Sequence, residues 1–304
     1  MGWQDVSGPA HFFQLQLRYA IIGLLGMLIA WRIDYHIYRT YAIPILLVTV
    51  MVLLVMALLQ GRWFLANRSI QPFEAAKYGA IIYIAVWLES TGKEIRKLTF
   101  GLVPFALLLG LIGGLIVAQQ DFSSTILFLT TATVMFFVAG ADLKQLLIGG
   151  AVGGGAVTAV ASIIPYLRRM RARLTIWPDP LQDPMDTGFQ TVQGLIALNR
   201  GGLFGVGFTQ SLQKLHLGRV PHTDYIFAII GEEWGFVGAT LVMGLYALWV
   251  WRGLRLARQA ADPFGRHLAV GLVAWVALQA ALNVAVITNS VPVTGTVLPF
   301  VSYG

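Results

Sequence analysis

Long apolar runs separated by short polar stretches dominate the pattern of hydrophobic and polar positions along the chain. Several of these runs reach the roughly 20 residues that a helix needs to cross a bilayer. The pattern therefore predicts an all-α, polytopic transmembrane helical bundle, with residues 1–304 forming a single membrane domain. The eight predicted spans are residues 15–33, 42–60, 74–90, 99–118, 123–140, 144–165, 224–251 and 267–288.

Composition points to the same class of protein. Of the 304 residues, 57% are hydrophobic and 12% are charged, and the mean hydropathy is +0.72. A soluble domain carries about twice that charged fraction. The chain has no cysteine, which excludes disulfides and cysteine-based metal or nucleophilic sites. The net charge of +7 does not indicate a nucleic-acid partner, because basic residues in a membrane protein mostly set its topology.

The basic residues are divided unequally between the two sides of the predicted bundle. One set of short loops carries ten of them, and the opposite short loops and span edges carry four, Arg18, Arg62, Arg68 and Lys77. The positive-inside rule places the richer set in the cytoplasm, so the long loop of about 166–223 is predicted to be extracytoplasmic. The ten are Arg32, Arg39, Lys93, Arg96, Lys97, Lys144, Arg252, Arg255, Arg258 and Arg266.

The stretch from Lys214 to Gly238 joins that loop to the seventh span and carries three acids, Asp224, Glu232 and Glu233. Acids within or at the edge of a membrane are costly and are functional candidates by default. Asp224 lies near the start of the predicted helix, where the helix dipole favours a carboxylate. The alternative is that Asp224 only caps the helix.

Other polar residues fall on the same predicted side. Glu74 and Lys77 are three positions apart, so they share a helix face and are able to pair, either around a substrate or as a structural ion pair. Asp121 begins another helix on this side, as a substrate contact or as an N-cap. The combination suits a substrate with an anionic headgroup and a lipid tail, although transporters also build polar membrane sites. The site comprises Arg62, Glu74, Lys77, Asp121, Lys214, His222 and Asp224.

Two further stretches carry structural expectations. The sixth span places Gly149 and Gly153, and likewise Gly150 and Gly154, four residues apart, a spacing that predicts close helix packing. The stretch after the eighth span, NSVPVTGTVLPFVSYG, interrupts helical structure and frees backbone groups. It is therefore expected to line a cavity or to pack on protein.

Several motifs resemble those of one known family. QKLHLGRVPHTDYIFAIIGEEWGFVG resembles the signature of the SEDS proteins, the FtsW/RodA/SpoVE group, and RIDYHIYR, GRWF, QPFEAAK, QQD, GGLFGVGFTQSLQKL and PVTGTVLPFVSYG resemble its other motifs in the same order. The GEE at Gly231–Glu233 and the DPFGR at Asp262–Arg266 look most like the FtsW division branch. The resemblance covers essentially the whole chain. It implies ten helices in the family, of which we expect eight here, without the first and the last.

The resemblance also implies an activity and its residues. The implied enzyme is a peptidoglycan glycosyltransferase that polymerises lipid II by inverting glycosyl transfer at the outer face of the bacterial plasma membrane during cell division. The catalytic aspartate of the HTD motif falls on Asp224, and the acid–lysine pair of the polar cavity falls on Glu74 and Lys77. The predicted substrate-binding residues are Arg62, Glu74, Lys77, Asp121, Gln190, Lys214, His222, Thr223, Thr294 and Ser302.

The implied partners are lipid II, a class B penicillin-binding protein and other divisome membrane proteins. No protein metal site is predicted and no cofactor is certain; a divalent cation, Mg or Mn, is left open. The chain departs from the family pattern at Phe73, Gln120, His216, Gly218 and Arg219, and keeps Asp224. The alternatives are a RodA-like elongation polymerase, a lipid II flippase, which needs a polar path through the whole membrane, and a structural scaffold, in which the site charges are dispensable.

Overall fold

The structure is a computed structural model that describes residues 10–58, 72–119, 121–163, 174–175, 177–183, 188–216 and 224–302. Within its helices, the side chains of residues 10–13, 15, 72–75, 156–163 and 215–216 are outside the description. The described residues are helical or irregular and contain no strand. The predicted all-α class is therefore confirmed.

Each of the eight predicted spans coincides with a helix. The π-helical turn η2 leads directly into α5, so these two together form the fourth span. The corresponding elements are α1 (Ala10–Arg32), α3 (Ala42–Leu58), α4 (Pro72–Thr91), η2 (Leu98–Leu102) with α5 (Val103–Ala118), α6 (Phe122–Val138), α7 (Leu143–Ile163), α11 (Ile226–Gln259) and α12 (Pro263–Ile287). The remaining elements are α2 (His36–Thr40), η1 (Gly92–Arg96), η3 (Pro180–Gln182), α9 (Phe189–Gly201) and α10 (Gln213–His216).

Several helices have the dimensions of membrane spans. Among the described residues, the stretches Leu98–Ala118, Ile226–Gln259 and Pro263–Ile287 are long and apolar enough to cross a membrane. Ala42–Leu58 and Phe122–Val138 are apolar but shorter. Their large aliphatic residues remain exposed, for example Leu107 at 70% and Val48 at 61%. Such exposure is expected where lipid rather than protein surrounds a helix.

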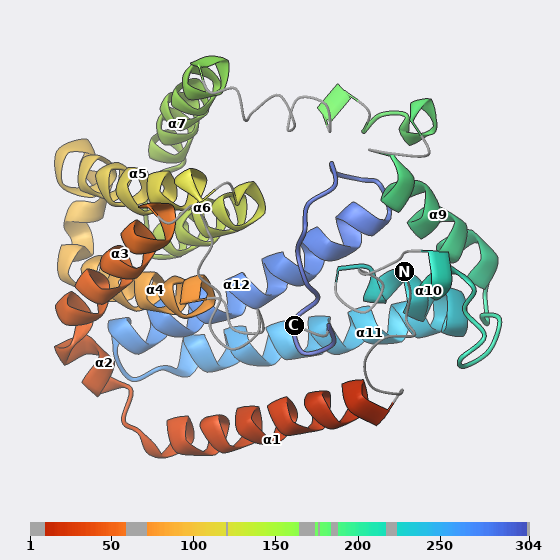
Figure 1. The fold of residues 1–304 in the computed structure, drawn as a ribbon. Coiled ribbons are helices and arrows are strands. Elements are labelled where there is room, and N and C mark those ends of the chain that lie inside the picture. Colours follow the sequence, from red (N-terminus) through yellow and green to blue (C-terminus); the bar gives the residue numbers. More distant parts are fainter. Residues whose placement is uncertain are drawn as a thin grey trace.

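Helix α12 lies between two hydrophobic cores and contributes to both (Figure 1). The larger core joins α12 to α3, α4, α5 and α6, with Trp275 of α12 only 1% exposed. The smaller core joins the far end of α12 to α9, α11 and the chain that follows it, around Tyr225, Ile287 and Leu298. Helix α12 is therefore the element that joins the two cores.

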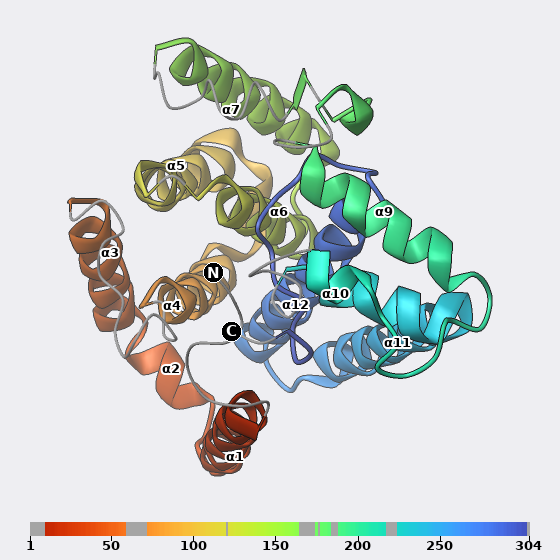
Figure 2. The ribbon, with the colours of Figure 1, turned by 45° about the vertical axis from the view of Figure 1, so that its right-hand side comes forward.

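The short basic loops meet at one end of the bundle. The hydroxyl of Tyr35, between α1 and α2, donates to Asp262, which caps the N-terminus of α12. His36 lies 3.4 Å from the same carboxylate, and Arg39 pairs with Glu89 at 2.9 Å. Helices α9 and α10, from the long loop, lie at the opposite end (Figures 1 and 2). The structure therefore groups the loops as the basic-residue pattern predicted.

Helix α7 stands at the margin of the bundle (Figure 2). A methyl group at Gly149 would lie 3.2 Å from Leu102, but at Gly150, Gly153 or Gly154 it would meet no atom of the described residues within 4 Å. Among the described residues, the predicted close packing is therefore found at Gly149 and not at the other three glycines. Glycine spacing permits close approach of a second helix but does not by itself provide one.

Candidate active site

Asp224 lies in the turn immediately before α11 and is partly buried. The N-cap position of α11 belongs to Tyr225, whose side chain is 1% exposed. Tyr225 packs against α9 so closely that a methyl group at Gly194 would lie 3.0 Å from its ring. The start of α11 is thus fixed by a buried aromatic residue, and Asp224 precedes the cap position that the capping alternative assigned to it.

Asn283 of α12 holds the backbone at Asp224. Its Nδ2 donates to the Asp224 carbonyl at 2.8 Å and to the Thr296 carbonyl at 2.6 Å. A methyl group at Gly295 would lie 3.4 Å from Oδ2 of Asp224, so the chain next to Thr296 passes beside the carboxylate. One buried amide therefore connects the candidate catalytic residue to a second segment of the site.

That second segment, residues 291–302, folds back after α12, and we call it the return segment. Gln279 donates to the Val297 carbonyl at 3.2 Å, and Tyr246 of α11 donates to the carbonyl of Pro299. The amide of Leu298 donates to the Ser302 hydroxyl at 2.8 Å. The free backbone groups expected in this stretch thus find partners in α11, α12 and the segment itself, which confirms that it packs on protein.

Lys77 of α4 is connected to the same face of α12. Its side chain is 4% exposed, and its Nζ lies 4.7 Å from the centre of the Trp275 ring, within the range of a cation–π contact. Trp275 donates to Oε1 of Gln279 at 2.9 Å. Trp275, Gln279 and Asn283 follow one another at four-residue intervals, so one face of α12 runs from Lys77 to Asp224.

The remaining predicted site residues have different surroundings. Asp121 accepts a hydrogen bond from the Ser124 amide at 2.9 Å and so caps α6. Gln190 is half-buried at the start of α9, and the Thr294 hydroxyl lies 3.4 Å from that of Thr296. The structure brings Asp224 and the return segment together. Arg62, His222, Thr223 and the side chain of Glu74 lie outside the described residues, so the Glu74–Lys77 pair stays a prediction.

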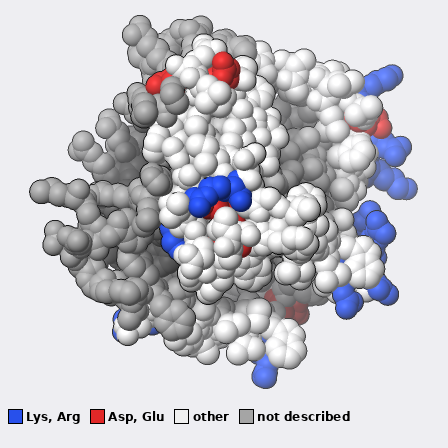
Figure 3. All heavy atoms as spheres, turned by 90° about the vertical axis from the view of Figure 1, so that its right-hand side faces the viewer, with Lys and Arg blue, Asp and Glu red and all other residues white. Residues whose placement is uncertain are grey.

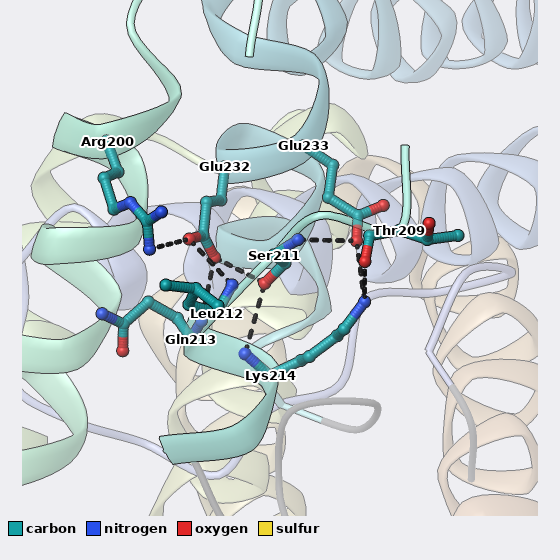
Figure 4. Close-up of polar contacts among 8 residues, drawn as sticks. All are labelled: Arg200, Thr209, Ser211, Leu212, Gln213, Lys214, Glu232 and Glu233. Carbon is teal, nitrogen blue, oxygen red and sulfur yellow. Dashed lines mark hydrogen bonds and ion pairs between the residues drawn. The ribbon is translucent and has the colours of Figure 1, made fainter. Parts of the chain in front are cut away.

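Glu232, which lies further into the seventh span than Asp224, has a different set of contacts (Figure 4). Its side chain is fully buried and accepts hydrogen bonds from the Ser211 hydroxyl at 2.5 Å and from the Leu212 and Gln213 amides at 3.2 Å each. Arg200 of α9 lies 3.4 Å away. This carboxylate therefore holds the loop before α10 to α11.

Glu233 binds the same loop. It accepts from the Ser211 amide at 3.4 Å and lies 3.5 Å from Nζ of Lys214, which also donates to the Thr209 carbonyl. Lys214, expected to bind substrate, thus has loop contacts in the structure. Figure 3 shows basic and acidic side chains together in the middle of this face of the molecule, within a largely uncharged described surface.

The loop also forms hydrogen bonds with the backbone of α11, through residues 202–207. The helix breaks at Gly235, with φ 68° and ψ −165°. The carbonyls of Glu232 and Glu233 accept from Val206 and Gly207 at 3.0 and 3.1 Å, and the amides of Phe236 and Val237 donate to Gly202 and Leu203 at 2.8 and 3.1 Å. Two internal hydrogen bonds of the helix are thus replaced by four bonds to the loop.

The sequence analysis did not identify Gln279 and Asn283 of α12, nor the binding of the loop by Glu232 and Glu233. Gln279 and Asn283 are amides four positions apart in an otherwise apolar span, and that spacing was a signal available in the sequence. The described residues contain no group of three or more His, Asp or Glu side chains suited to a metal ion.

Comparison with known proteins agrees with this architecture. The family described as "Cell cycle protein", covering FtsW, RodA and SpoVE, matches residues 3–304. A Geobacter sp. (strain M18) protein named "Probable peptidoglycan glycosyltransferase FtsW" is 37% identical over 302 residues, which cover 96% of this chain and 82% of that protein. Stage V sporulation protein E of Bacillus subtilis (strain 168) is 37% identical over 317 residues, covering 99% of this chain and 85% of that protein.

Solved structures show the same fold. One chain of a peptidoglycan synthase complex described as coordinating polymerization and crosslinking aligns with a TM-score of 0.78 and 27% identity, over 97% of this chain and 84% of that one. The rod shape determining protein RodA of Thermus thermophilus aligns with a TM-score of 0.66 and 25% identity, over 98% of this chain and 83% of that one. The chain therefore belongs to the FtsW/RodA/SpoVE family of membrane proteins.

Proposed function

We propose that this protein is a peptidoglycan glycosyltransferase that polymerises lipid II into glycan strands during cell division. Relatives named as FtsW glycosyltransferases support the activity and the division role. The observation that carries the proposal is the Asp224 junction, where an acid beside the return segment is joined through α12 to the buried cation Lys77.

In the proposed reaction, a sugar 4-hydroxyl of one lipid II attacks the anomeric carbon at the lipid-linked end of the growing strand. The new C–O bond forms as the bond to undecaprenyl pyrophosphate breaks, and the configuration inverts. Asp224 takes the hydroxyl proton, and a general base of this kind contributes on the order of 10²–10⁴-fold. The pyrophosphate leaves with both electrons of the broken bond, so positive charge near it lowers the barrier.

Lys77 is the described cation best placed to supply that charge. It is buried in a mostly apolar part of the bundle, where charge interacts more strongly than in water. Arg62 remains a second candidate by its motif, and the loop contacts of Lys214 favour a structural role for that residue. A divalent cation bound at the site would neutralise charge on the same pyrophosphate.

The site is proposed to face the extracytoplasmic side of the bacterial plasma membrane. The grouping of the basic loops at the opposite end of the bundle supports this orientation. Single cysteines are informative because the chain has none of its own. A cysteine at Gln210, which is exposed, should react with an impermeant thiol reagent in intact cells, and one at Arg255 should not. The reverse labelling would contradict the orientation.

The proposed partner is a class B penicillin-binding protein within the divisome. A complex that coordinates polymerization and crosslinking, matched at 27% identity, supports a partner of this type. A flippase needs polar groups through the whole membrane, whereas Glu232 and Glu233, the deeper acids, are bonded to the loop. This arrangement favours the polymerase over the flippase.

Polymerisation by purified components tests the function. The full-length protein, purified with its class B penicillin-binding protein, should convert labelled lipid II into glycan strands that lysozyme digests. A transpeptidase-inactive partner should leave strand formation intact, because crosslinking is a separate reaction. Movement of lipid II across proteoliposomes without strand formation would contradict the proposal and favour the flippase.

A further inference from the structure

We infer that Asn283 is a positioning residue for the glycosyl transfer, which acts by fixing the Asp224 carboxylate beside the return segment. The inference rests on the proposed function, because it assumes that Asp224 performs the chemistry. Asn283 was absent from the site expected from the sequence, and it reaches that site from near the C-terminal end of an apolar helix.

The bonding of Asn283 gives it a defined orientation. Both of its partners, at Asp224 and Thr296, are backbone carbonyls, which only accept hydrogen bonds. The NH2 group must therefore face them, and each of its two hydrogens serves one carbonyl. The side chain is 1% exposed, so water does not compete for these donors.

The bond to Asp224 controls the direction of its carboxylate. Holding the carbonyl fixes the peptide plane between Asp224 and Tyr225, and thereby the direction in which the Cα–Cβ bond of Asp224 points. The second bond holds Thr296, the neighbour of Gly295, which lies beside the carboxylate. A single nitrogen thus sets the spacing between the candidate base and the backbone that lines its site.

Among the described contacts, the other side chains that bind the return segment do not also bind Asp224. Tyr246 binds the segment at Pro299, and Gln279 binds it at Val297. If α12 and α11 only had to keep the segment folded, these bonds would be equivalent to that of Asn283. The structure instead gives Asn283 a bond to each side of the site, which predicts an effect on catalysis that the other tethers do not have.

The effect should appear in kcat rather than in KM. Misplacement of a catalytic group by about 1 Å costs up to about 100-fold in rate. Asn283→Ala should therefore lower kcat for lipid II polymerisation by about 10- to 100-fold and leave KM within about twofold, because the residue contacts backbone rather than substrate. The acid limb of the pH–rate profile should keep its position, since Asp224 remains the base.

The experiment compares variants of the full-length protein in complex with its penicillin-binding protein. Tyr246→Phe is the matched control, since it removes one hydrogen bond to the return segment and leaves Asp224 untouched; its kcat should stay within about twofold of wild type. Asn283→Leu keeps a similar side-chain volume and removes the donors without adding a charge, and it serves if the alanine variant does not fold. It should lose kcat to a similar extent.

Three results would overturn the inference: near-wild-type kcat in the folded Asn283 variant, an equal loss of kcat in Tyr246→Phe, or a change confined to KM. An Asp224→Asn control separates this inference from the function on which it rests. If Asp224→Asn is inactive and the Asn283 variant is normal, only the positioning role is lost. If Asp224→Asn polymerises normally, the catalytic assignment itself fails.

Discussion

Asp224 lies in the turn before α11 and Glu232 lies eight residues later within that helix, and the two acids have different surroundings. The described contacts at Asp224 reach its backbone carbonyl, from Asn283, and its partly buried side chain lies beside Gly295. The contacts of Glu232 reach its carboxylate, which is fully buried among three donors and Arg200. Asn283 thus holds the main chain at Asp224, whereas the carboxylate of Glu232 holds a loop.

The difference shows how acids near a membrane should be interpreted. A buried charge persists only when it is paired and hydrogen-bonded, and Glu232 meets that condition entirely with protein donors. Such a carboxylate is needed for the fold of the outer loop. Asp224 is only partly buried, in the turn before α11, so a ligand can reach it. The three acids that stood out together in the sequence therefore divide into two kinds.

Loss of the Glu232 carboxylate should have the largest effect on stability. Glu232→Ala leaves three loop donors without their acceptor, and each buried donor left unsatisfied costs about 1–3 kcal/mol, whereas Arg200 is 40% exposed and can be solvated. The midpoint of thermal unfolding in detergent should fall clearly. Glu94→Ala is the matched control, because Glu94 pairs with Lys97 at the exposed surface, where an ion pair contributes about 0–1 kcal/mol. If the thermal midpoint fell equally in the two variants, the structural role assigned to the Glu232 carboxylate would be contradicted.

A substitution at Gly235, where α11 breaks, should lower the stability of the fold somewhat less than the loss of Glu232. A methyl group there would lie 2.4 Å from the Gly205 amide nitrogen, at a φ of 68° that other residues rarely adopt. Gly235→Ala should cost about 2–4 kcal/mol and weaken the loop's attachment near Glu232. Gly244, in the same helix, has open space around it, so Gly244→Ala should be neutral or stabilising by up to about 1 kcal/mol. Denaturant unfolding of both variants checks the contrast.

The smallest effect is expected at the opposite end of the molecule. A hydrogen bond to Asp34 raises the pKa of His36 above its ordinary 6.5. A pKa that is raised in the folded state contributes stability that is fully present below about pH 6.5 and is lost as pH rises through the folded value. The thermal midpoint should therefore fall slightly between about pH 6 and pH 8.5, and His36→Gln should flatten that dependence. An unchanged slope in this variant would contradict the assignment.

Much of the fold was available in the sequence, because apolar length alone locates membrane helices. All eight spans coincide with helices, and the packed return segment followed from its unpaired backbone groups. The loop's insertion at Gly235 was not predicted, because each of its four backbone bonds joins residues about 30 positions apart. For the same reason, Asn283 could be noticed as an amide in an apolar helix but not assigned its two carbonyl partners.

The central claim is that Asp224 performs chemistry and Glu232 performs folding. It is tested most directly by measuring the polymerisation rate per folded molecule for Asp224→Asn and Glu232→Gln, each purified with its penicillin-binding protein. We predict that Asp224→Asn folds and binds its partner normally but polymerises lipid II at least about 100-fold more slowly. Glu232→Gln should unfold at lower temperature yet retain most of the activity of its folded fraction. Near-normal polymerisation by folded Asp224→Asn would contradict the account.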